Sequence, residues 1–238
     1  MSTPGLFITG TSTEVGKTHI AAMIARALVA DGRRVGVYKP AASGCRREGD
    51  ALVADDALML WEAAGRPGRL EDVCPQRFLA PLAPHRAARE EGRRVDAALL
   101  RSGIEPWLAS SEIVLVEGAG GLMSPLGDDD YNVDLAGEFG FPLVVVATNE
   151  LGVINQALQT IITAQARAPH LRIAGVVLNQ ATRRDGDVSL ASNAEELRAR
   201  CPVPLLATVS HGENAFGARV DWFRLACAGT SVGVQPPV

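Results

Sequence analysis

A strand–loop–helix segment near the N-terminus constrains the fold of this chain more than any other feature. An apolar run at residues 6–9 predicts a buried strand, and the stretch GTSTEVGKT follows it from Gly10 to Thr18. Residues 19–30 then carry apolar side chains at helical spacing. A buried strand that leads through a glycine-rich loop into a helix is typical of parallel α/β sheets, whose ligands bind outside the carboxyl ends of the strands.

Further elements continue this pattern along the chain. Runs rich in Val, Ile and Leu predict five more strands, at residues 34–38, 112–116, 143–147, 173–178 and 203–207. Helical spacing predicts helices at residues 51–64, 95–108, 153–167 and 190–200. Pro106 is expected to end or kink the second of these, and residues 65–85, with four prolines, are expected to form a long surface connection. Near-continuous apolar strands indicate that helices cover both faces, so the fold class is α/β with a doubly wound, mostly parallel sheet.

Length and composition favour a single folding unit. The 238 residues are 47% hydrophobic, which is enough for one core, so we expect one α/β domain at residues 1–228 and a loose C-terminal tail at 229–238. The net charge of −4 gives no electrostatic reason to expect nucleic acid or an anionic membrane as a partner. The scattered cysteines, the absence of a signal-peptide pattern and the absence of an apolar run of about 20 residues favour a cytoplasmic protein.

The glycine-rich stretch predicts a phosphate-binding loop of the P-loop type. Glycines allow backbone N–H groups to turn toward phosphate oxygens, and the start of the following helix adds further N–H groups. Lys17 can then reach the β- and γ-phosphates of a nucleotide, and the Thr18 hydroxyl can bind Mg²⁺. Five residues, instead of the common four, lie between Gly10 and Gly16. The lengthened part includes Glu14, which either faces solvent or turns toward the nucleotide or a cationic substrate.

Charged residues also stand at the ends of two other predicted strands. Lys39 directly follows the second strand, and Pro40 after it favours an extended backbone that holds the ammonium near the strand end. Glu117 ends the third strand before a glycine-rich run and suits a ligand of Mg²⁺ or of its water shell, with a carboxylate that caps the loop as the alternative. Asp55 and Asp56 begin the helix after the second strand, and one of them is a further metal-ligand candidate.

Five motifs in sequence order carry a family resemblance. The stretches GTSTEVGKT, YKPAASG, DDALML, VEGAGGLMSPL and LGVINQAL resemble those of dethiobiotin synthetases, P-loop enzymes of biotin biosynthesis. The resemblance extends from residue 7 to about residue 214 and weakens over 65–110 and after 215. The lengthened loop is the form that this family uses.

The resemblance implies a cyclo-ligase reaction. ATP, Mg²⁺ and CO₂ would convert 7,8-diaminononanoate into dethiobiotin, ADP and phosphate. A carbamate would form on one amine, its oxygen would attack the γ-phosphorus to give a carbamic-phosphoric anhydride, and the second amine would close the cyclic urea. Such a transfer depends on positioning and on cations that stabilise the developing charge.

The same resemblance assigns site residues. Lys17 and Lys39 would be catalytic, with Lys39 beside the carbamate and the transferred phosphate, and Thr18, Asp56 and Glu117 would share Mg²⁺. Thr13 and Ser43 would lie near the diamine and the carbamate. Nucleotide contacts would come from Glu14, Val15, Gly16, Lys17, Thr18, Asp56, Glu117, Gly118, Ala119, Gly120, the adenine-reading Asn179, and the base-pocket residues Ser210, His211, Gly212 and Glu213.

A last motif implies a partner. In the family, the segment that corresponds to LGVINQAL receives the substrate carboxylate from across a homodimer interface. Leu151, Gly152 and Val153 open a predicted helix, whose free N–H groups can bind a carboxylate, and Asn155 can add an amide donor. A plain helix start is the alternative. The acidic run 128–130 is expected to be a solvated loop, with a second cation site as the alternative.

Three other protein classes share parts of this pattern. A partitioning or cell-division ATPase of the same broad fold usually carries an additional lysine near the first glycine of the loop, whereas Lys17 is the one lysine in this loop. A small-molecule kinase would have a similar loop and similar metal ligands, but would leave a stable phosphorylated product. An amide-forming ligase that uses a glutaminase domain would need a longer chain.

Overall fold

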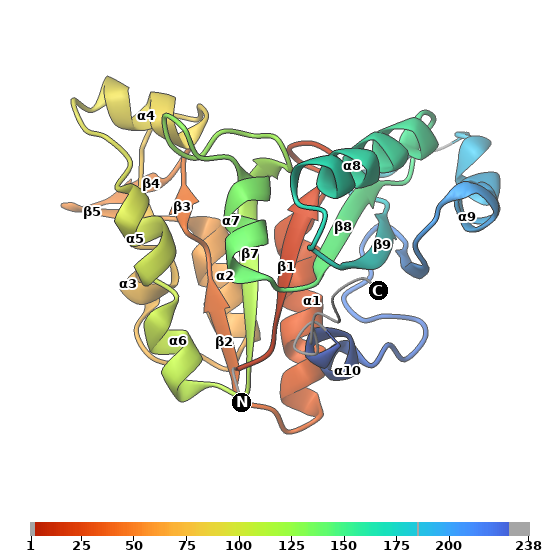
Figure 1. Cartoon of the computed structure of the whole chain (residues 1–238), viewed down its shortest axis with the longest axis horizontal. Coiled ribbons are helices and arrows are strands. Elements are labelled where there is room, and N and C mark those ends of the chain that lie inside the picture. The colour runs from red at the N-terminus through yellow and green to blue at the C-terminus, as the bar shows by residue number, and fades with distance from the viewer. Residues whose placement is uncertain (1–2, 185, 229–238) are drawn as a thin grey trace, which may run out of the picture.

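The structure, a computed structural model, describes residues 3–184 and 186–228. Its centre is a six-stranded parallel sheet (Figure 1). The strands, in the order in which they lie side by side, are β10 (Leu205–Val209), β9 (Ile173–Asn179), β8 (Leu143–Thr148), β1 (Gly5–Gly10), β7 (Ile113–Gly121) and β2 (Val35–Tyr38). The chain builds one side of β1 through β2 and β7, and the other side through β8, β9 and β10. The carboxyl end of β1 is therefore the switch point where such sheets bind ligands.

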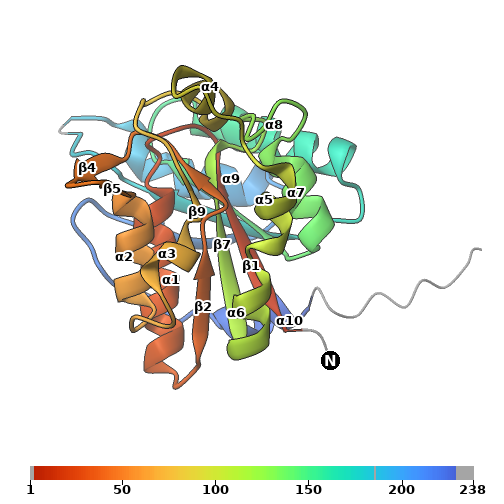
Figure 2. The same cartoon turned by 90° about the vertical axis from the view of Figure 1, so that its left-hand side faces the viewer.

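Helices cover both faces of the sheet, as the sequence predicts. Figure 2 shows one group to the left of the strands, consisting of α1 (Lys17–Ala30), α2 (Asp55–Ala63) and α3 (Leu70–Val73). The opposite group consists of α5 (Ala97–Ser102), α6 (Glu105–Ser110), α7 (Asn132–Phe139) and α8 (Val153–Arg167). The remaining helices are α4 (Pro84–Glu90), α9 (Ser189–Arg200), which contacts β10, and α10 (Trp222–Cys227), which contacts β1 and α1.

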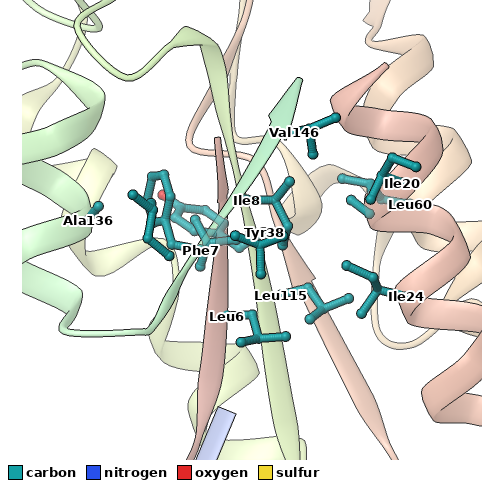
Figure 3. Packing of buried hydrophobic residues seen from close by; sticks show 14 of the residues in the cluster. Leu6, Phe7, Ile8, Ile20, Ile24, Tyr38, Leu60, Leu115, Ala136 and Val146 are labelled. Atoms are coloured by element: carbon teal, nitrogen blue, oxygen red, sulfur yellow. The ribbon is translucent and has the colours of Figure 1, made fainter. Parts of the chain in front are cut away.

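Side chains of the central strands are buried on both faces. Ile8 of β1 faces Ile20 and Ile24 of α1, whereas its neighbour Phe7 points to the opposite side, toward Ala136 of α7 (Figure 3). All five side chains are fully buried. This two-sided burial explains why the strand reads as a continuous apolar run instead of an alternating one.

The predicted helix at 51–64 is wrong in its first part. Residues 51–53 form β5 (Ala51–Val53), which pairs antiparallel with β4 (Arg46–Glu48), and the helix begins at Asp55. Gly49 lies between the two strands with a φ of +58°, a conformation that favours a tight turn. A second small sheet joins β3 (Ala41–Ala42) to β6 (Gln76–Arg77).

The predicted helix at 95–108 is two helices. The Asp96 carboxylate accepts a hydrogen bond from the Leu99 N–H at 2.9 Å and caps the start of α5, which ends before Gly103. The break at residues 103–104 comes just before Pro106, which cannot donate a helical hydrogen bond to Ser102 and lies in the first turn of α6, where the missing N–H costs nothing. The expected surface connection at 65–85 contains α3 and β6, and α4 begins within it.

The C-terminal tail and membrane-spanning helices are the last features to compare with the sequence. The tail predicted at 229–238 lies outside the described residues. Among the residues that the structure describes, no helix has both the length and the apolar character needed to cross a bilayer.

Candidate active site

The loop between β1 and α1 is held in an unusual backbone conformation. Glu14 and Gly16 have φ values of +58° and +86°. A Cβ atom on Gly16 would lie 2.1 Å from Nδ2 of Asn179, so both conformation and close approach require glycine there. Glu14 is exposed and lines the main cavity. Positive φ at a non-glycine residue is uncommon and often marks a functional loop.

The only two lysines in the sequence meet in this region. Lys17 is 7% exposed, and its ammonium donates to the Ser12 carbonyl at 3.1 Å. Lys39, at the end of β2, is 3% exposed, and its backbone N–H donates to the Val73 carbonyl at 2.7 Å. Lys17 follows the loop after β1 and Lys39 follows β2, so both side chains lie at the carboxyl-end edge of the sheet, with β7 between their strands.

Two carboxylates hold the ammonium of Lys39. Its Nζ lies 2.7 Å from Oε1 of Glu117 and 2.8 Å from Oδ2 of Asp56. Glu117 is 1% exposed, whereas the side chain of Asp56 is 49% exposed and opens toward the cavity. The preceding Asp55 instead pairs with Arg46 at 2.6 Å, so the structure selects Asp56 as the carboxylate of the site.

The charges of this cluster shift one another's pKa values. Burial lowers the pKa of Lys39, but attraction to Glu117 and Asp56 outweighs burial and leaves it above the usual range. Burial raises the pKa of Glu117, and Lys39 opposes this in part. Burial also raises the pKa of Asp56, but Lys39 outweighs it and the net pKa is lowered. The pKa of Lys17 is lowered, first by burial and further by Lys39, against the attraction of Glu117.

The oxygen atoms around Glu117 fit a small hard cation. Thr18 donates its hydroxyl hydrogen to Oε1 of Glu117 at 2.8 Å, while Oε2 of Glu117 is buried without a hydrogen-bond partner. Mg²⁺ prefers one or two carboxylates together with water and phosphate oxygens over an all-protein cage. Within the described residues there is no group of three or more His, Cys, Asp or Glu side chains that could hold a metal by itself. Thr18, Asp56 and Glu117 are therefore suitable ligands for Mg²⁺ that is shared with a nucleotide.

These residues lie in a cavity of about 900 Å³ at the carboxyl ends of the strands. Most of the residues expected at the site line it: Thr13, Glu14, Gly16, Lys17, Thr18, Lys39, Ser43, Asp56, Glu117, Ala119, Gly120, Asn179, Ser210, His211 and Gly212. The charged cluster and the 210–212 segment thus border the same space, which is large enough for a nucleotide and a small second substrate.

Three of the expected nucleotide contacts do not line the cavity. Val15 is buried and presents its backbone carbonyl to Asn179. Gly118 lies behind the wall, where a Cβ atom would be 2.5 Å from Oδ1 of Asn132. Glu213 accepts a hydrogen bond from the Ser210 N–H at 2.7 Å and so fixes the base-side loop instead of facing the cavity.

The cavity also has wall residues that the sequence reading missed. They are His19, Ala42, Pro81, Leu82, Ala83, Pro84, Ser124, Pro125, Gln180 and Ala181. The four from Pro81 to Pro84 belong to the proline-rich stretch that was expected to be only a surface connection. Its prolines were the available signal, since they favour a stiff segment over a disordered one.

Asn132, at the start of α7, supports the glycine-rich end of β7. Its Nδ2 donates to the carbonyls of Ala119 at 2.7 Å and Gly121 at 2.8 Å, and its Oδ1 accepts from the Ala119 N–H at 3.1 Å. It is fully buried. The side chain thus replaces sheet hydrogen bonds along the segment that borders the cavity.

The acidic run at 128–130 is pinned by arginines. Asp128 pairs with Arg89 of α4 at 2.5 Å, and Asp130 pairs with Arg101 of α5 at 2.8 Å. The side chain of Asp128 remains 43% exposed, as expected for a solvated loop, whereas that of Asp130 is 17% exposed. Both carboxylates pair with arginines from segments far away in sequence.

The expected carboxylate-binding segment stands apart from the cavity. Gly152, with a φ of +98°, precedes α8, Leu151 is 83% exposed, and Val153 is buried. Leu151, Gly152, Val153 and Asn155 line neither the main cavity nor the adjoining cavity of about 400 Å³, which lies between Thr13 and the middle of α8. Within one chain, these four residues are not brought to the charged cluster.

A family profile and several proteins match most of the length of this chain. The profile of a family described as AAA domain matches residues 4–215. The ATP-dependent dethiobiotin synthetase BioD of Rhodopirellula baltica is 44% identical over 214 residues, which cover 85% of this chain and 82% of the relative. Proteins of the same name from Aromatoleum aromaticum and Anaeromyxobacter dehalogenans are 38% and 43% identical. These matches cover 90% and 85% of this chain, and 93% and 89% of the relatives.

Solved structures share the fold at much lower identity. A structure described as a plasmid partition protein from Borrelia burgdorferi matches with a TM-score of 0.56 and 12% identity, covering 97% of both chains. The ParA family ATPase from Chlorobium tepidum matches with a TM-score of 0.55 and 16% identity, covering 90% of this chain and 87% of its own. This likeness concerns the fold alone, whereas the closer sequence relatives define the family: the chain belongs to the ATP-dependent dethiobiotin synthetases.

Proposed function

We propose that this chain forms dethiobiotin from 7,8-diaminononanoate, CO₂ and ATP, as an ATP-dependent cyclo-ligase of biotin biosynthesis. Family membership supports the reaction. The observation that carries the assignment to a site is the convergence of two ammonium groups, two carboxylates and a hydroxyl in one cavity at the carboxyl ends of the strands.

The reaction proceeds in three steps. The lone pair of one amine of the diamine attacks the carbon of CO₂, and the nitrogen loses a proton to give a carbamate. A carbamate oxygen then attacks the γ-phosphorus of ATP, the bond to the bridging oxygen breaks, and ADP leaves. The second amine attacks the carbamoyl carbon, the C–O bond to phosphate breaks, and the nitrogen loses a proton as the cyclic urea closes.

The two lysines take different parts in these steps. Lys17 follows the loop glycines and holds the β- and γ-phosphates. Lys39 is a fixed positive charge, since its pKa lies above the usual range, and it stabilises the negative charge that spreads over the transferred phosphoryl group and the carbamate. Thr13 and Ser43, on the cavity wall, donate hydrogen bonds to the carbamate and the diamine.

A divalent cation completes this site. We propose that Thr18, Asp56 and Glu117 hold Mg²⁺, because they supply a hydroxyl and two carboxylates, and one Glu117 oxygen is buried without a partner. Bound Mg²⁺ would neutralise charge on the phosphates. The Lys39 ammonium lies between the same two carboxylates and balances part of their charge.

The phosphates of ATP lie along the loop, and its base lies at the other end of the cavity. Glu14, Val15 and Gly16 provide backbone groups along the phosphates, and Gly118, Ala119 and Gly120 pass beside the nucleotide. Asn179 reads the base, with Ser210, His211, Gly212 and Glu213 closing the pocket. For Val15, Gly118 and Glu213 the structure supports an indirect role through the residues that they hold.

The position of the expected carboxylate-binding segment supports a site shared between two subunits. Leu151, Gly152, Val153 and Asn155 line neither cavity of their own chain, and Leu151 is 83% exposed. We propose a homodimer in which these residues bind the carboxylate of a diamine held mainly by the partner chain, using the N–H groups at the start of α8.

We further propose one domain at residues 1–228 and a cytoplasmic location. One buried core contains residues from β1 through α10, which supports a single folding unit. Use of ATP and the buried thiols of Cys45 and Cys74 support a reducing, ATP-containing compartment.

Product analysis tests the function. Purified protein with ATP, Mg²⁺, bicarbonate and 7,8-diaminononanoate is expected to give ADP, phosphate and a product heavier than the diamine by CO₂ less water, as mass spectrometry would detect. A stable phosphorylated diamine would instead identify a kinase. ATP hydrolysis that responds to DNA or lipid and not to the diamine would identify a regulatory ATPase.

A further inference from the structure

Asn179 is held in place by two neighbouring strands and by burial. It ends β9, where its carbonyl accepts from the Asn149 N–H at 2.8 Å, and it pairs in register with Thr148 of β8 and Val209 of β10. It is 2% exposed. The backbone at this position is therefore held between two neighbouring strands, and the side chain projects from a rigid base.

The side chain reaches the phosphate loop, 164 residues away in sequence. Its Nδ2 donates to the Val15 carbonyl at 2.9 Å, in a bond that is itself buried. The same nitrogen would lie 2.1 Å from a Cβ atom on Gly16, so the amide packs directly against the peptide between Val15 and Gly16. The identity of the two amide atoms follows from chemistry, because a carbonyl can only accept and the atom facing it must be the donor.

This contact falls where the loop most needs support. Glu14 and Gly16, on either side of Val15, both have positive φ. A sparsely populated backbone conformation persists only where the surroundings hold it in place. Other anchors of the loop lie elsewhere: the Thr11 N–H donates to the Val146 carbonyl at 2.9 Å, and Lys17 reaches Ser12.

We infer that Asn179 is a positioning residue for the phosphate loop as well as a base contact, so that one side chain links the base end of the cavity to its phosphate end. With Nδ2 committed to Val15, the oxygen Oδ1 is left as an acceptor for the exocyclic amino group of a base. The inference rests on the proposed ATP site and adds that losing this amide weakens phosphate binding even when no base is present.

Inorganic tripolyphosphate separates the two roles, because it has the phosphates of ATP and no base. Asn179→Ala is expected to lower the affinity for tripolyphosphate, measured by calorimetry, by about fivefold to tenfold, the effect of losing one hydrogen bond. The affinity for ATP is expected to fall further, because the base contact is also lost. Asn179→Ser keeps a polar side chain, but its hydroxyl is too short to reach Val15. The same losses of affinity for tripolyphosphate and ATP are therefore expected.

A matched control is available in α9. Asn193 is also a buried asparagine, 4% exposed, whose Nδ2 donates to Oδ1 of Asn149 at 2.8 Å and to the Glu150 carbonyl at 3.1 Å, outside the cavity. Asn193→Ala loses a comparable buried amide, and its tripolyphosphate affinity is expected to equal that of the unsubstituted protein. Equal loss in both variants would attribute the effect to general loosening and overturn the inference.

A ligand-free measurement covers the loop directly. Hydrogen–deuterium exchange of peptides that contain residues 11–18 is expected to be faster in Asn179→Ala than in Asn193→Ala. Unchanged exchange together with unchanged tripolyphosphate affinity would leave Asn179 a base contact only and contradict the inference. Failure of the unsubstituted protein to bind ATP would count against the proposed function instead, while the exchange comparison would still decide the positioning role.

Discussion

At the residue scale, the cationic side chains of the site differ in type from those on the surface. The sequence has 23 lysines and arginines, and only Lys17 and Lys39 are lysines. Arginines such as Arg89 and Arg101 form the exposed pairs with carboxylates. A compact ammonium fits between the two carboxylates of the cluster, whereas a planar guanidinium requires more room and a forked partner. Both lysines of the sequence thus line the cavity.

Replacing Lys39 tests this division. Lys39→Ala is expected to lower turnover by about 10²- to 10³-fold, because a charge that stabilises the transition state is lost. ATP affinity, measured by calorimetry, is expected to change little, since Lys17 remains. Lys39→Arg keeps the charge but not its compact shape and is expected to recover little activity. Near-normal turnover of Lys39→Ala would show that Lys39 has another role.

Replacing Glu117 tests the metal ligands. Glu117→Gln keeps the size of the side chain but removes its charge, so the Mg²⁺ concentration for half-maximal turnover is expected to rise by about tenfold or more, a typical effect of weakening the support of a metal. Glu112, just before the opposite end of β7, pairs with Arg34 at 3.5 Å on the surface, and Glu112→Gln is the control with unchanged Mg²⁺ dependence. Equal Mg²⁺ curves for all three proteins would exclude Glu117 as a ligand.

At the scale of elements, strand ends could be read from the sequence and long-range contacts could not. The apolar runs before Lys39 and Glu117 placed both residues at one edge of the sheet, where the structure finds them together. The prolines of residues 81–84 indicate a stiff segment, but its position on the cavity wall depends on tertiary contacts that no local pattern encodes. The sequence does not predict helix α7, because its N-cap residue, Tyr131, is not a usual capping residue. The Asp134 carboxylate nevertheless accepts a hydrogen bond from the Tyr131 N–H at 3.0 Å.

Asn132, the first residue of α7, is expected to stabilise the fold through its buried hydrogen bonds. Asn132→Ala removes several buried hydrogen bonds to the carboxyl-end segment of β7, so the free energy of unfolding is expected to fall by about 3 kcal/mol in chemical denaturation. Asn214, exposed and bonded to Gly212 at 3.4 Å, provides the control, and Asn214→Ala is expected to leave stability unchanged. A fall of less than about 1 kcal/mol for Asn132→Ala would show that water replaces the lost contacts.

At the scale of the whole molecule, the proposed dimer joins two segments that one chain keeps apart. The charged cluster and the start of α8 belong to different parts of the surface, and the exposed side chains of Leu151 and Ile162 lie on the segment that a partner would cover. The sequence predicts a shared site only through the family resemblance, since no local pattern indicates which chain would supply which part of it.

Mixing two inactive variants tests the shared site. Lys39→Ala damages the cluster, and Asn155→Glu places a negative charge where the substrate carboxylate should bind. In a two-fold dimer, a mixed pair has one site with both changes and one with neither, so random exchange is expected to restore about a quarter of the activity. Light scattering should find dimers for each variant. No recovery after confirmed subunit exchange would mean that each chain holds a complete site.

The route of the carbamate oxygen tests the central claim most directly. When turnover is started with CO₂ labelled with both ¹³C and ¹⁸O and stopped before the label exchanges with water, mass spectrometry is expected to find ¹³C in the cyclic urea. One ¹⁸O is expected in the released phosphate, because the oxygen that attacks the γ-phosphorus leaves with it. Phosphate that contains only the oxygens of ATP and solvent would contradict transfer through a carbamic-phosphoric anhydride.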